Sequence, residues 1–326
     1  MRAVVLREHG GPEKLTLAEV DMPAPGRGEV LVRIHAAALN PVDSKIRNGL
    51  PVGPALPAIL GADLAGVVEA VGEDVRGFAV GDAVYGCAGG VKGMGGTMAT
   101  HIAADAQLLA KKPASLSFRE AAALPLVAIT AANVMQRAAI APGEKVLVHG
   151  GVGGVGHIAV QMAKAAGAHV VATVSTEEAG EIARGLGADA TVLRSTPVAD
   201  YVAEHTGGKG FDAVIDTVGG ENLLRSFEAA RPQGRVATIN ARTTLDLGQM
   251  HGKALSLHVI FMLLPLLTGQ GRAAHGEVLR DVAAQVDAGK LRPLLDPHVF
   301  ELAEAGEAHA LLDSGKARGK IVIDIA

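Results

Sequence analysis

Short apolar runs separated by Gly, Pro, Asp and Asn fill residues 1 to about 110. The runs are AVVL, EVLVRIHAAAL, AGVVEAVG, DAVYG and QLLAKK. Runs of this length that are bounded by turn-forming residues are typical of β-strands. The pattern therefore predicts a compact, barrel-like and β-rich unit in the first part of the chain.

The pattern changes at about residue 119, where REAAALPLVAITAANVMQRAAI has the apolar spacing and alanine content of a helix, broken once at Pro125. We therefore expect a domain boundary near residue 122. Beyond it, predicted strands and helices alternate. The strands are KVLVHG, HVVATV, ATVL, FDAVIDTV and GRVATIN, and the helices between them are residues 154–166, TEEAGEIARGLG, residues 198–206 and ENLLRSFEAA. Strict alternation predicts an α/β fold with a parallel, doubly wound sheet.

The C-terminal part returns to a mixed pattern. After Gly269 come an amphipathic helix, HGEVLRDVAAQVDAGK, a helix around residues 303–313 and a final strand, KIVIDIA, which we expect to rejoin the first unit. Residues 1–122, completed by 270–326, would then form one domain and residues 123–269 the other. The most apolar run, residues 254–267, is shorter than the ~20 residues of a membrane helix. We interpret it as core or subunit interface.

Composition narrows the class of protein. With 326 residues, 49% of them apolar, and 42 glycines, the chain suits a two-domain, turn-rich α/β protein. The net charge of −4 and the absence of Trp argue against a nucleic-acid partner. Cys87 is the single cysteine, so a disulfide framework is excluded. A charged pair follows the first six residues, too early for a signal peptide. We expect a soluble, cytoplasmic protein without a membrane partner.

A glycine turn follows the strand KVLVHG. Gly151, Gly153 and Gly156 satisfy G-x-G-x-x-G directly after an apolar strand and at the start of a helix. Such a turn lets a diphosphate approach the backbone, and the helix N-terminus supplies N–H donors. The pattern predicts a dinucleotide on Gly153, Gly154 and Val155. The alternative is a tight strand-to-helix turn without a ligand.

The end of the second strand decides between NAD and NADP. An NAD site places Asp or Glu there to bind the ribose hydroxyl, whereas this chain has Ser175 and Thr176. Hydroxyls can donate to a 2′-phosphate, so the pattern favours NADPH. Glu177 and Glu178 follow at once, and we interpret them as the first turn of a helix that Ser175 or Thr176 caps. Arg194 is the nearest candidate cation, although its position also suits a solvated loop arginine.

One long segment resembles a known superfamily. GADLAGVVEAVGEDVRGFAVGDAVYG, residues 61–86, is similar to the glycine and valine signature of the medium-chain dehydrogenases/reductases. With LPLVAITA at 124–131 and the glycine turn at 150–156, the resemblance covers essentially the whole chain. It implies a GroES-like catalytic domain made from both ends of the sequence, a Rossmann domain between them and an active cleft at their junction.

The resemblance also bears on zinc. Zinc-dependent members have a Cys in the loop that here reads ALNPVDSK, and GHE at the positions of residues 61–63. Both ligand positions are lost, to Asn40 or a neighbour and to Ala62, and CAGGVKGMGG replaces the lobe with four cysteines. Zinc needs several aligned N or S donors, which one cysteine cannot supply. The remaining possibility is a site made of Cys87, His35 and Asp63.

The loop Leu39–Arg47, LNPVDSKIR, is similar to that of zinc-independent quinone oxidoreductases and of enone and alkenal reductases. The resemblance implies hydride transfer from NADPH to a quinone, enal or enone. Lys45 and Asn40 are the candidate donors toward the developing oxyanion, although an ordinary exposed helix lysine fits Lys45 equally. Asp43 is expected to cap the short helix. The most similar quinone reductases have Tyr at Lys45 and Lys at Ala179, so this chain departs from their pattern.

The resemblance implies further cofactor contacts and an assembly. Thr130, Asn240 and the strand around His258 fall at positions that approach the nicotinamide in the family, and Val218 is a further cofactor-binding candidate. A homodimer through residues 254–267 is a family expectation. His149 and His157 flank the glycine turn and are expected to be structural. Two alternatives stay open: a zinc-type alcohol dehydrogenase with atypical ligands, and a crystallin-like protein that binds NADPH without turnover.

Overall fold

The computed structural model describes residues 1–325, which fold into two compact units. The first comprises Met1–Ile129 together with the chain from Leu263 onward, and the second comprises Thr130–Met262. Helix α3 (Pro125–Ala138) therefore runs from the first unit into the second. The sequence pattern placed the first boundary near residue 122 because the apolar spacing changes where the helices begin, not where the units divide.

Unit 1 contains two β-sheets. In the larger, the strand order is β15-β16-β3-β5-β6-β8, with β7 pairing to β3, and in the smaller it is β2-β1-β4. The bounds are β1 (Arg2–Leu6), β2 (Leu15–Glu19), β3 (Glu29–Ala38), β4 (Ala58–Ile59), β5 (Asp63–Val71), β6 (Ala83–Cys87), β7 (His101–Asp105), β8 (Leu109–Lys111), β15 (Phe300–Glu301) and β16 (Val322–Asp324). Strand β16 pairs antiparallel with β3, which confirms that the last strand rejoins the first unit.

The helices of unit 1 are α1 (Pro41–Arg47), α2 (Phe118–Ala122), α9 (Leu264–Thr268), α10 (Arg272–Asp287) and α11 (Ala305–Ser314), and α3 begins in this unit. Short 3₁₀ turns occupy Pro12–Lys14, Ala106–Leu108 and Leu302–Glu304. The predicted break at Pro125 is confirmed, because α2 ends at Ala122 and α3 starts at Pro125. Proline lacks the N–H group and is therefore favourable only in the first turn of a helix.

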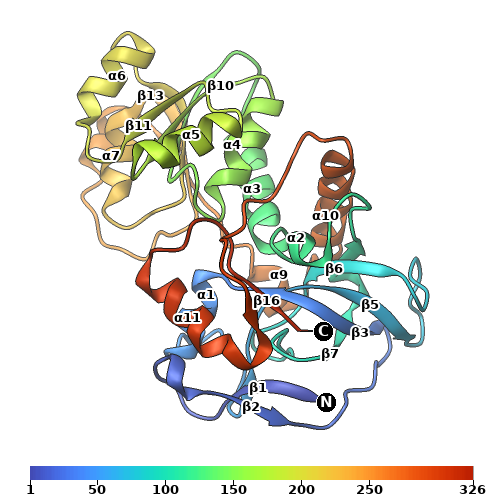
Figure 1. Cartoon of the computed structure of the whole chain (residues 1–326). Helices are drawn as coiled ribbons and strands as arrows, with labels where there is room; N and C mark the ends of the chain where they lie inside the picture. The colour runs from blue at the N-terminus through green and yellow to red at the C-terminus, as the bar shows by residue number, and fades with distance from the viewer. Residues whose placement is uncertain (326) are drawn as a thin grey trace. The chain divides into compact units, whose positions relative to one another are not determined.

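Unit 2 is built on one parallel sheet with the order β11-β10-β9-β12-β13-β14. The strands are β9 (Lys145–His149), β10 (His169–Val174), β11 (Ala190–Leu193), β12 (Phe211–Asp216), β13 (Ala230–Thr238) and β14 (Ser256–Val259). The helices are α4 (Gly156–Ala165), α5 (Glu177–Gly185), α6 (Val198–Thr206), α7 (Asn222–Ala229) and α8 (Gly248–Gly252) (Figure 1). The structure confirms the predicted parallel, doubly wound sheet.

Both faces of this sheet are buried. On one face Leu147 packs with Tyr201 of α6 and Phe227 of α7. Its neighbours in the strand, Val146 and Val148, point to the opposite face and are also fully buried. Continuous apolar strands of this kind require helices on both sides of the sheet. Their C-terminal ends thus meet at one edge, where loops are free to form a site.

The edge strand β14 and the residues that follow it have apolar side chains in solvent. Val259, Phe261 and Leu264 are 51%, 46% and 54% exposed in a segment that was predicted as core or subunit interface. An exposed apolar edge strand is a template for pairing with another chain. The homodimer expected through residues 254–267 stays a prediction. Within residues 1–325, no helix has both the length and the apolar character that a membrane crossing requires.

Three of the buried histidines have a strongly lowered pKa. Burial lowers the pKa of His149, His275 and His309 to about 4, and the nearby Arg47 guanidinium adds to the effect on His309. His309 Nδ1 lies 3.0 Å from Arg47 Nη1 and accepts its proton, which requires a neutral ring. These three rings are therefore held in the neutral form in the folded protein.

We expect His275 to make the folded protein sensitive to acid. Its pKa is about 4 when folded, whereas an unfolded histidine has a pKa near ~6.5, so the unfolded chain binds more protons between these values. The stabilising contribution is complete above that range and is lost as the pH falls through it. In His275→Gln, denaturant unfolding should show a pH slope that is smaller by up to ~1.4 kcal/mol per pH unit. If the free energy of unfolding depends on pH in the same way in both proteins, His275 does not cause the acid sensitivity.

Candidate active site

The glycine turn joins β9 to α4 in unit 2. Its positive φ of 71° lies at Gly150, one residue before the predicted motif. The motif glycines serve close packing instead. A Cβ on Gly151 would lie 2.6 Å from the Ala172 Cβ atom, and one on Gly156 would lie 2.0 Å from the Gly150 oxygen. Larger residues at these two positions would displace the backbone.

The turn presents its backbone at the start of a ten-residue helix. Gly153 is exposed, Gly154 is half-buried and the Val155 side chain is buried. The Gly153 carbonyl accepts the His157 N–H at 3.0 Å, so the helical pattern of hydrogen bonds already starts there. The N–H groups of a first helical turn attract anions. The three residues therefore fit a dinucleotide diphosphate.

The exposed residues after β10 are the hydroxyl pair predicted from the sequence. Thr176 caps α5, because its Oγ1 accepts the Ala179 N–H at 3.2 Å, and Ser175 precedes it. Since Oγ1 serves as acceptor in the cap, its own proton stays available. The Arg194 N–H donates to the Val174 carbonyl at 2.8 Å, which fixes the Arg194 backbone beside this strand end. Its side chain is exposed.

Two further predicted residues meet at the neighbouring strand ends. Asn240 Nδ2 donates to the Val218 carbonyl at 3.2 Å, and the Asn240 carbonyl accepts the Gly220 N–H at 3.2 Å. Val218 is 52% exposed. His258 lies on β14 opposite Ala237 of β13. Thr130 is elsewhere, buried on α3.

In unit 1 the structure places Lys45 on helix α1. The Lys45 side chain is exposed in the last turn of the helix. Asn40 precedes the helix, and its N–H donates to Asp43 Oδ2 at 2.7 Å. The expectation that Asp43 is the N-cap of a helix that begins at Ser44 is wrong, because the helix starts at Pro41 and Asn40 is its N-cap. Asp43 is the third residue of the first turn and accepts the N–H of the N-cap residue.

The side chain of Asn40 is part of a buried polar network. Its Nδ2 donates to Asp63 Oδ2 at 2.9 Å, and its Oδ1 accepts from Lys320 Nζ at 2.5 Å. Lys320 also donates to the Leu39 carbonyl at 2.8 Å and lies 3.4 Å from Asp63 Oδ2. Asp63 Oδ1 accepts the Leu126 N–H at 2.8 Å, in the first turn of α3. Asp63 thus links α1 to α3. The donor role predicted for Asn40 stays a prediction.

Charge in this network is not balanced. Two carboxylates, Asp43 and Asp63, share the single ammonium of Lys320, and the three side chains are at most 3% exposed. Burial, with the Asp63 charge adding to it, raises the pKa of Asp43 to about 7. Burial also raises the pKa of Asp63 and lowers that of Lys320, while their mutual attraction opposes both shifts. Lys320 was missed from the sequence because it sits within an ordinary strand pattern.

The residues that remained possible zinc ligands do not form a metal site. Cys87 pairs with Asp63 across β6 and β5, and burial, with Asp63 next in effect, raises the pKa of its thiol well above the ordinary value. The ring of His35 stacks on Phe118 at 4.4 Å. Zinc binds the thiolate and neutral imidazole forms. In the part of the chain that the structure describes, no three His, Cys, Asp or Glu side chains are grouped to hold a metal.

Known proteins resemble this chain over its full length. Quinone oxidoreductase of Homo sapiens is 32% identical over 99% of this chain and 97% of its own length. The chain belongs to the medium-chain dehydrogenase/reductase superfamily. Within it the chain is an enzyme of the quinone and enone reductase type. Family models for an alcohol dehydrogenase GroES-like domain and for a zinc-binding dehydrogenase match residues 26–114 and 186–323.

Other members of the superfamily extend the comparison. The 2-methylene-furan-3-one reductase of Solanum lycopersicum is 34% identical over 99% of this chain and 79% of its own length. An alcohol dehydrogenase superfamily protein from Novosphingobium aromaticivorans is 46% identical, with a TM-score of 0.96 over the whole of both chains. The Escherichia coli quinone oxidoreductase, solved with NADPH, is 29% identical, with a TM-score of 0.88 over 99% of this chain and all of that one. These matches confirm the predicted GroES-like and Rossmann folds.

Breaking the buried ion pair should destabilise unit 1. Lys320→Met leaves the Asp63 charge without a partner, which costs about 3–5 kcal/mol in other buried pairs. Lys320→Met combined with Asp63→Asn removes the uncompensated charge and should therefore lose less stability than the sum of the two single variants. Denaturant unfolding of the four proteins measures the coupling. Losses in the free energy of unfolding that add up in the double variant would contradict a coupling between Lys320 and Asp63.

Proposed function

We propose that this enzyme is an NADPH-dependent reductase of quinones or α,β-unsaturated carbonyls that works without zinc. The observation that carries the proposal is the end of β10. Exposed Ser175 and Thr176 stand where an NAD site has a carboxylate, and Thr176 keeps a proton to donate. The backbone of Arg194 lies beside the same strand end. The glycine turn fits the diphosphate of the same cofactor.

The acceptor class follows from the relatives and from the donors in this chain. The relatives are named for a quinone and for a methylene-furanone, both electron-poor acceptors whose carbonyl takes up negative charge. Such acceptors need no Lewis acid, because the developing charge spreads onto their own oxygen. A bound nicotinamide supplies the hydride. The protein then has to orient the acceptor and to stabilise the oxyanion.

Lys45 is our candidate for the stabilising group. Its ammonium is exposed at the end of α1, where it is free to point at an acceptor oxygen. Asn40 was predicted as a second donor, but one N–H of its amide donates to Asp63 and its oxygen accepts from Lys320. We propose that Asn40 instead holds the first turn of α1, so that it acts on the reaction through the placement of Lys45.

Two other functions are less well supported. A zinc-type alcohol dehydrogenase would need ligands that the described residues 1–325 do not bring together. A crystallin-like NADPH-binding protein without turnover fits the fold equally but leaves the exposed Lys45 without a role. A screen of NADPH and NADH oxidation over quinones, enals and enones tests the proposal. Tight NADPH binding with no oxidation across the panel would favour the crystallin-like function.

Removing the Lys45 charge should slow turnover. We expect Lys45→Met to lower kcat by on the order of 10²-fold, the usual effect of losing one preorganised donor, with little change in NADPH affinity. Lys45→Arg, which keeps a cation, should retain more of the activity. Steady-state kinetics with a quinone and an enone, together with NADPH titration, measure both effects. An unchanged kcat in Lys45→Met would exclude Lys45 from the mechanism.

Removing Arg194 should discriminate between the two nicotinamide cofactors. Losing a charge-assisted hydrogen bond costs ~1.5–3 kcal/mol, so Arg194→Ala should weaken NADPH binding by roughly tenfold or more and leave NADH unchanged. Arg184→Ala is the matched control, because Arg184 is an exposed arginine of α5 that is bonded to Glu181. Equal losses for both cofactors would exclude a 2′-phosphate contact.

A further inference from the structure

A row of polar side chains closes one buried face of the parallel sheet in unit 2. Four strands contribute to the apolar core of that face through Leu147, Val171, Val214 and Val236. Side chains two residues apart on a strand share a face. The next residues on the same face are therefore polar, and they are Thr173, His149, Asp216 and Thr238, in the order of the strands β10, β9, β12 and β13. We call these four residues the polar row.

The two threonines of the polar row each hold a loop. Thr173 Oγ1 accepts the N–H of Gly150 at 3.1 Å, at the start of the glycine turn. Thr238 Oγ1 accepts the N–H of Asn240 at 3.3 Å. Both threonines are at most 5% exposed, so water has little access to these hydrogen bonds. The conformations of two loops with candidate cofactor contacts thus depend on buried hydroxyls.

Asp216 holds a third loop and is fully buried. Its Oδ1 accepts the N–H groups of Val218 and Gly219 at 2.9 and 2.8 Å. Asn222 Nδ2 also donates to Oδ1 at 3.1 Å, and Ser226 Oγ donates to Oδ2 at 3.1 Å. One carboxylate therefore fixes the loop that carries Val218 and ties it to the start of α7.

His149 contacts one other member of the row, Thr173, and the neighbouring Thr217. Its Nδ1 lies 3.3 Å from Thr173 Oγ1, and its carbonyl accepts from Thr217 Oγ1 at 2.6 Å. Thr173 Oγ1 therefore contacts both the Gly150 N–H and the His149 ring. Burial keeps this ring neutral, since it lowers the pKa of His149 to about 4.

We propose that the polar row positions the dinucleotide site, with Asp216 as its central member, by fixing the three loops that carry Gly153, Val218 and Asn240. The four residues of the row are buried beneath these loops and are positioning residues. The inference rests on the proposed function, because it takes these loops to be the cofactor loops. The affinity for the cofactor then depends on buried residues beneath the loops as well as on the residues that contact the cofactor.

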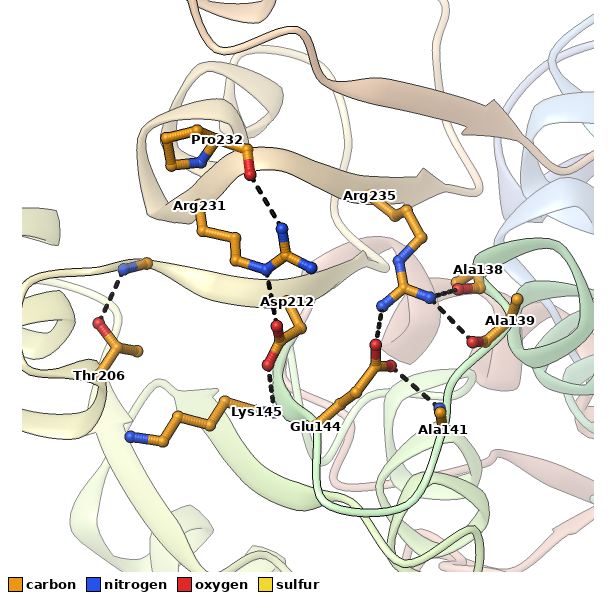
Figure 2. A network of polar contacts seen from close by, with 11 residues as sticks. Ala138, Ala139, Ala141, Glu144, Lys145, Thr206, Asp212, Arg231, Pro232 and Arg235 are labelled. Atoms are coloured by element: carbon orange, nitrogen blue, oxygen red, sulfur yellow. Dashed lines mark hydrogen bonds and ion pairs between the residues drawn. The ribbon is translucent and has the colours of Figure 1, made fainter.

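A pair of aspartates on one strand makes the test sharp. Asp216 and Asp212 lie at opposite ends of β12, and each accepts hydrogen bonds from both main-chain and side-chain donors. Asp212 accepts from Lys145 N and Arg231 Nε at 2.8 and 2.7 Å, at the end of the sheet away from the polar row (Figure 2). Asp212→Ala therefore removes a carboxylate with a main-chain and a side-chain hydrogen bond from the same strand without touching the loops.

We expect Asp216→Ala to raise the Kd of NADPH by tenfold or more, roughly the effect of losing bonds to a charged acceptor. Amide hydrogen exchange at Val218 and Gly219 should accelerate as well. Asp212→Ala should lower the melting temperature but leave the Kd and these exchange rates unchanged. If Asp216→Ala does not fold, Thr173→Val keeps the shape and loses only the acceptor of Gly150, and Thr173→Ser should restore binding.

The outcomes separate the two proposals. A Kd for NADPH that is unchanged in Asp216→Ala and in Thr173→Val would overturn the role of the polar row, and so would equal Kd increases in Asp216→Ala and Asp212→Ala. Failure of the unmodified protein to bind NADPH or NADH would instead overturn the proposed function. In that case the exchange rates at Val218 and Gly219 still decide whether Asp216 fixes its loop.

Discussion

A carboxylate that is removed from water needs hydrogen-bond donors for its oxygens, and this constraint organises the functional part of each unit. Asp63 and Asp216 are both fully buried. Each accepts main-chain N–H groups from a segment that follows in the chain, Leu126 in one case and Val218 with Gly219 in the other. Because the penalty for an unsatisfied buried carboxylate is large, these segments have little freedom to move away.

The two carboxylates are satisfied in different ways. Asp63 has the ammonium of Lys320 at 3.4 Å, so its surroundings hold formal charges of both signs. Asp216 is bonded to two backbone N–H groups, an amide and a hydroxyl, which are all neutral dipoles. Fixed dipoles keep their direction when a ligand binds or leaves. The ion pair of Asp63 and Lys320, in contrast, has a second acidic group, Asp43, close to it. Hydrogen bonds from uncharged donors to Asp216 suit a unit that is expected to bind and release an anionic cofactor.

The sequence predicts helices, strands and turns well where they depend on residues that are close together in the chain. The alternation of strands and helices after residue 145, the glycine turn and the break at Pro125 all depend on residues that are near one another. It does not predict Lys320 beside Asn40, since these residues are 280 positions apart and no local pattern marks the pair. The positive φ falls on Gly150, outside the motif, whereas Gly151 and Gly156 are required by close packing. The second boundary, at Leu263 instead of near residue 269, falls within one continuous apolar run.

The network around Asn40 also bears on the zinc-free reaction that we propose. The resemblance places a zinc-binding cysteine at or beside this position, but an amide there bonds to Lys320 and Asp63, and Ala62 has no donor atom. A divalent ion near this network would repel the Lys320 ammonium, and it would have to strip Asp63 of its bonds to Leu126 and Asn40. The two positions that differ from the zinc-dependent members, Asn40 and Ala62, thus occur together with a buried lysine, Lys320. The cation in this part of unit 1 is covalently part of the protein, and its bonds are used to hold helix α1, from which Lys45 is presented.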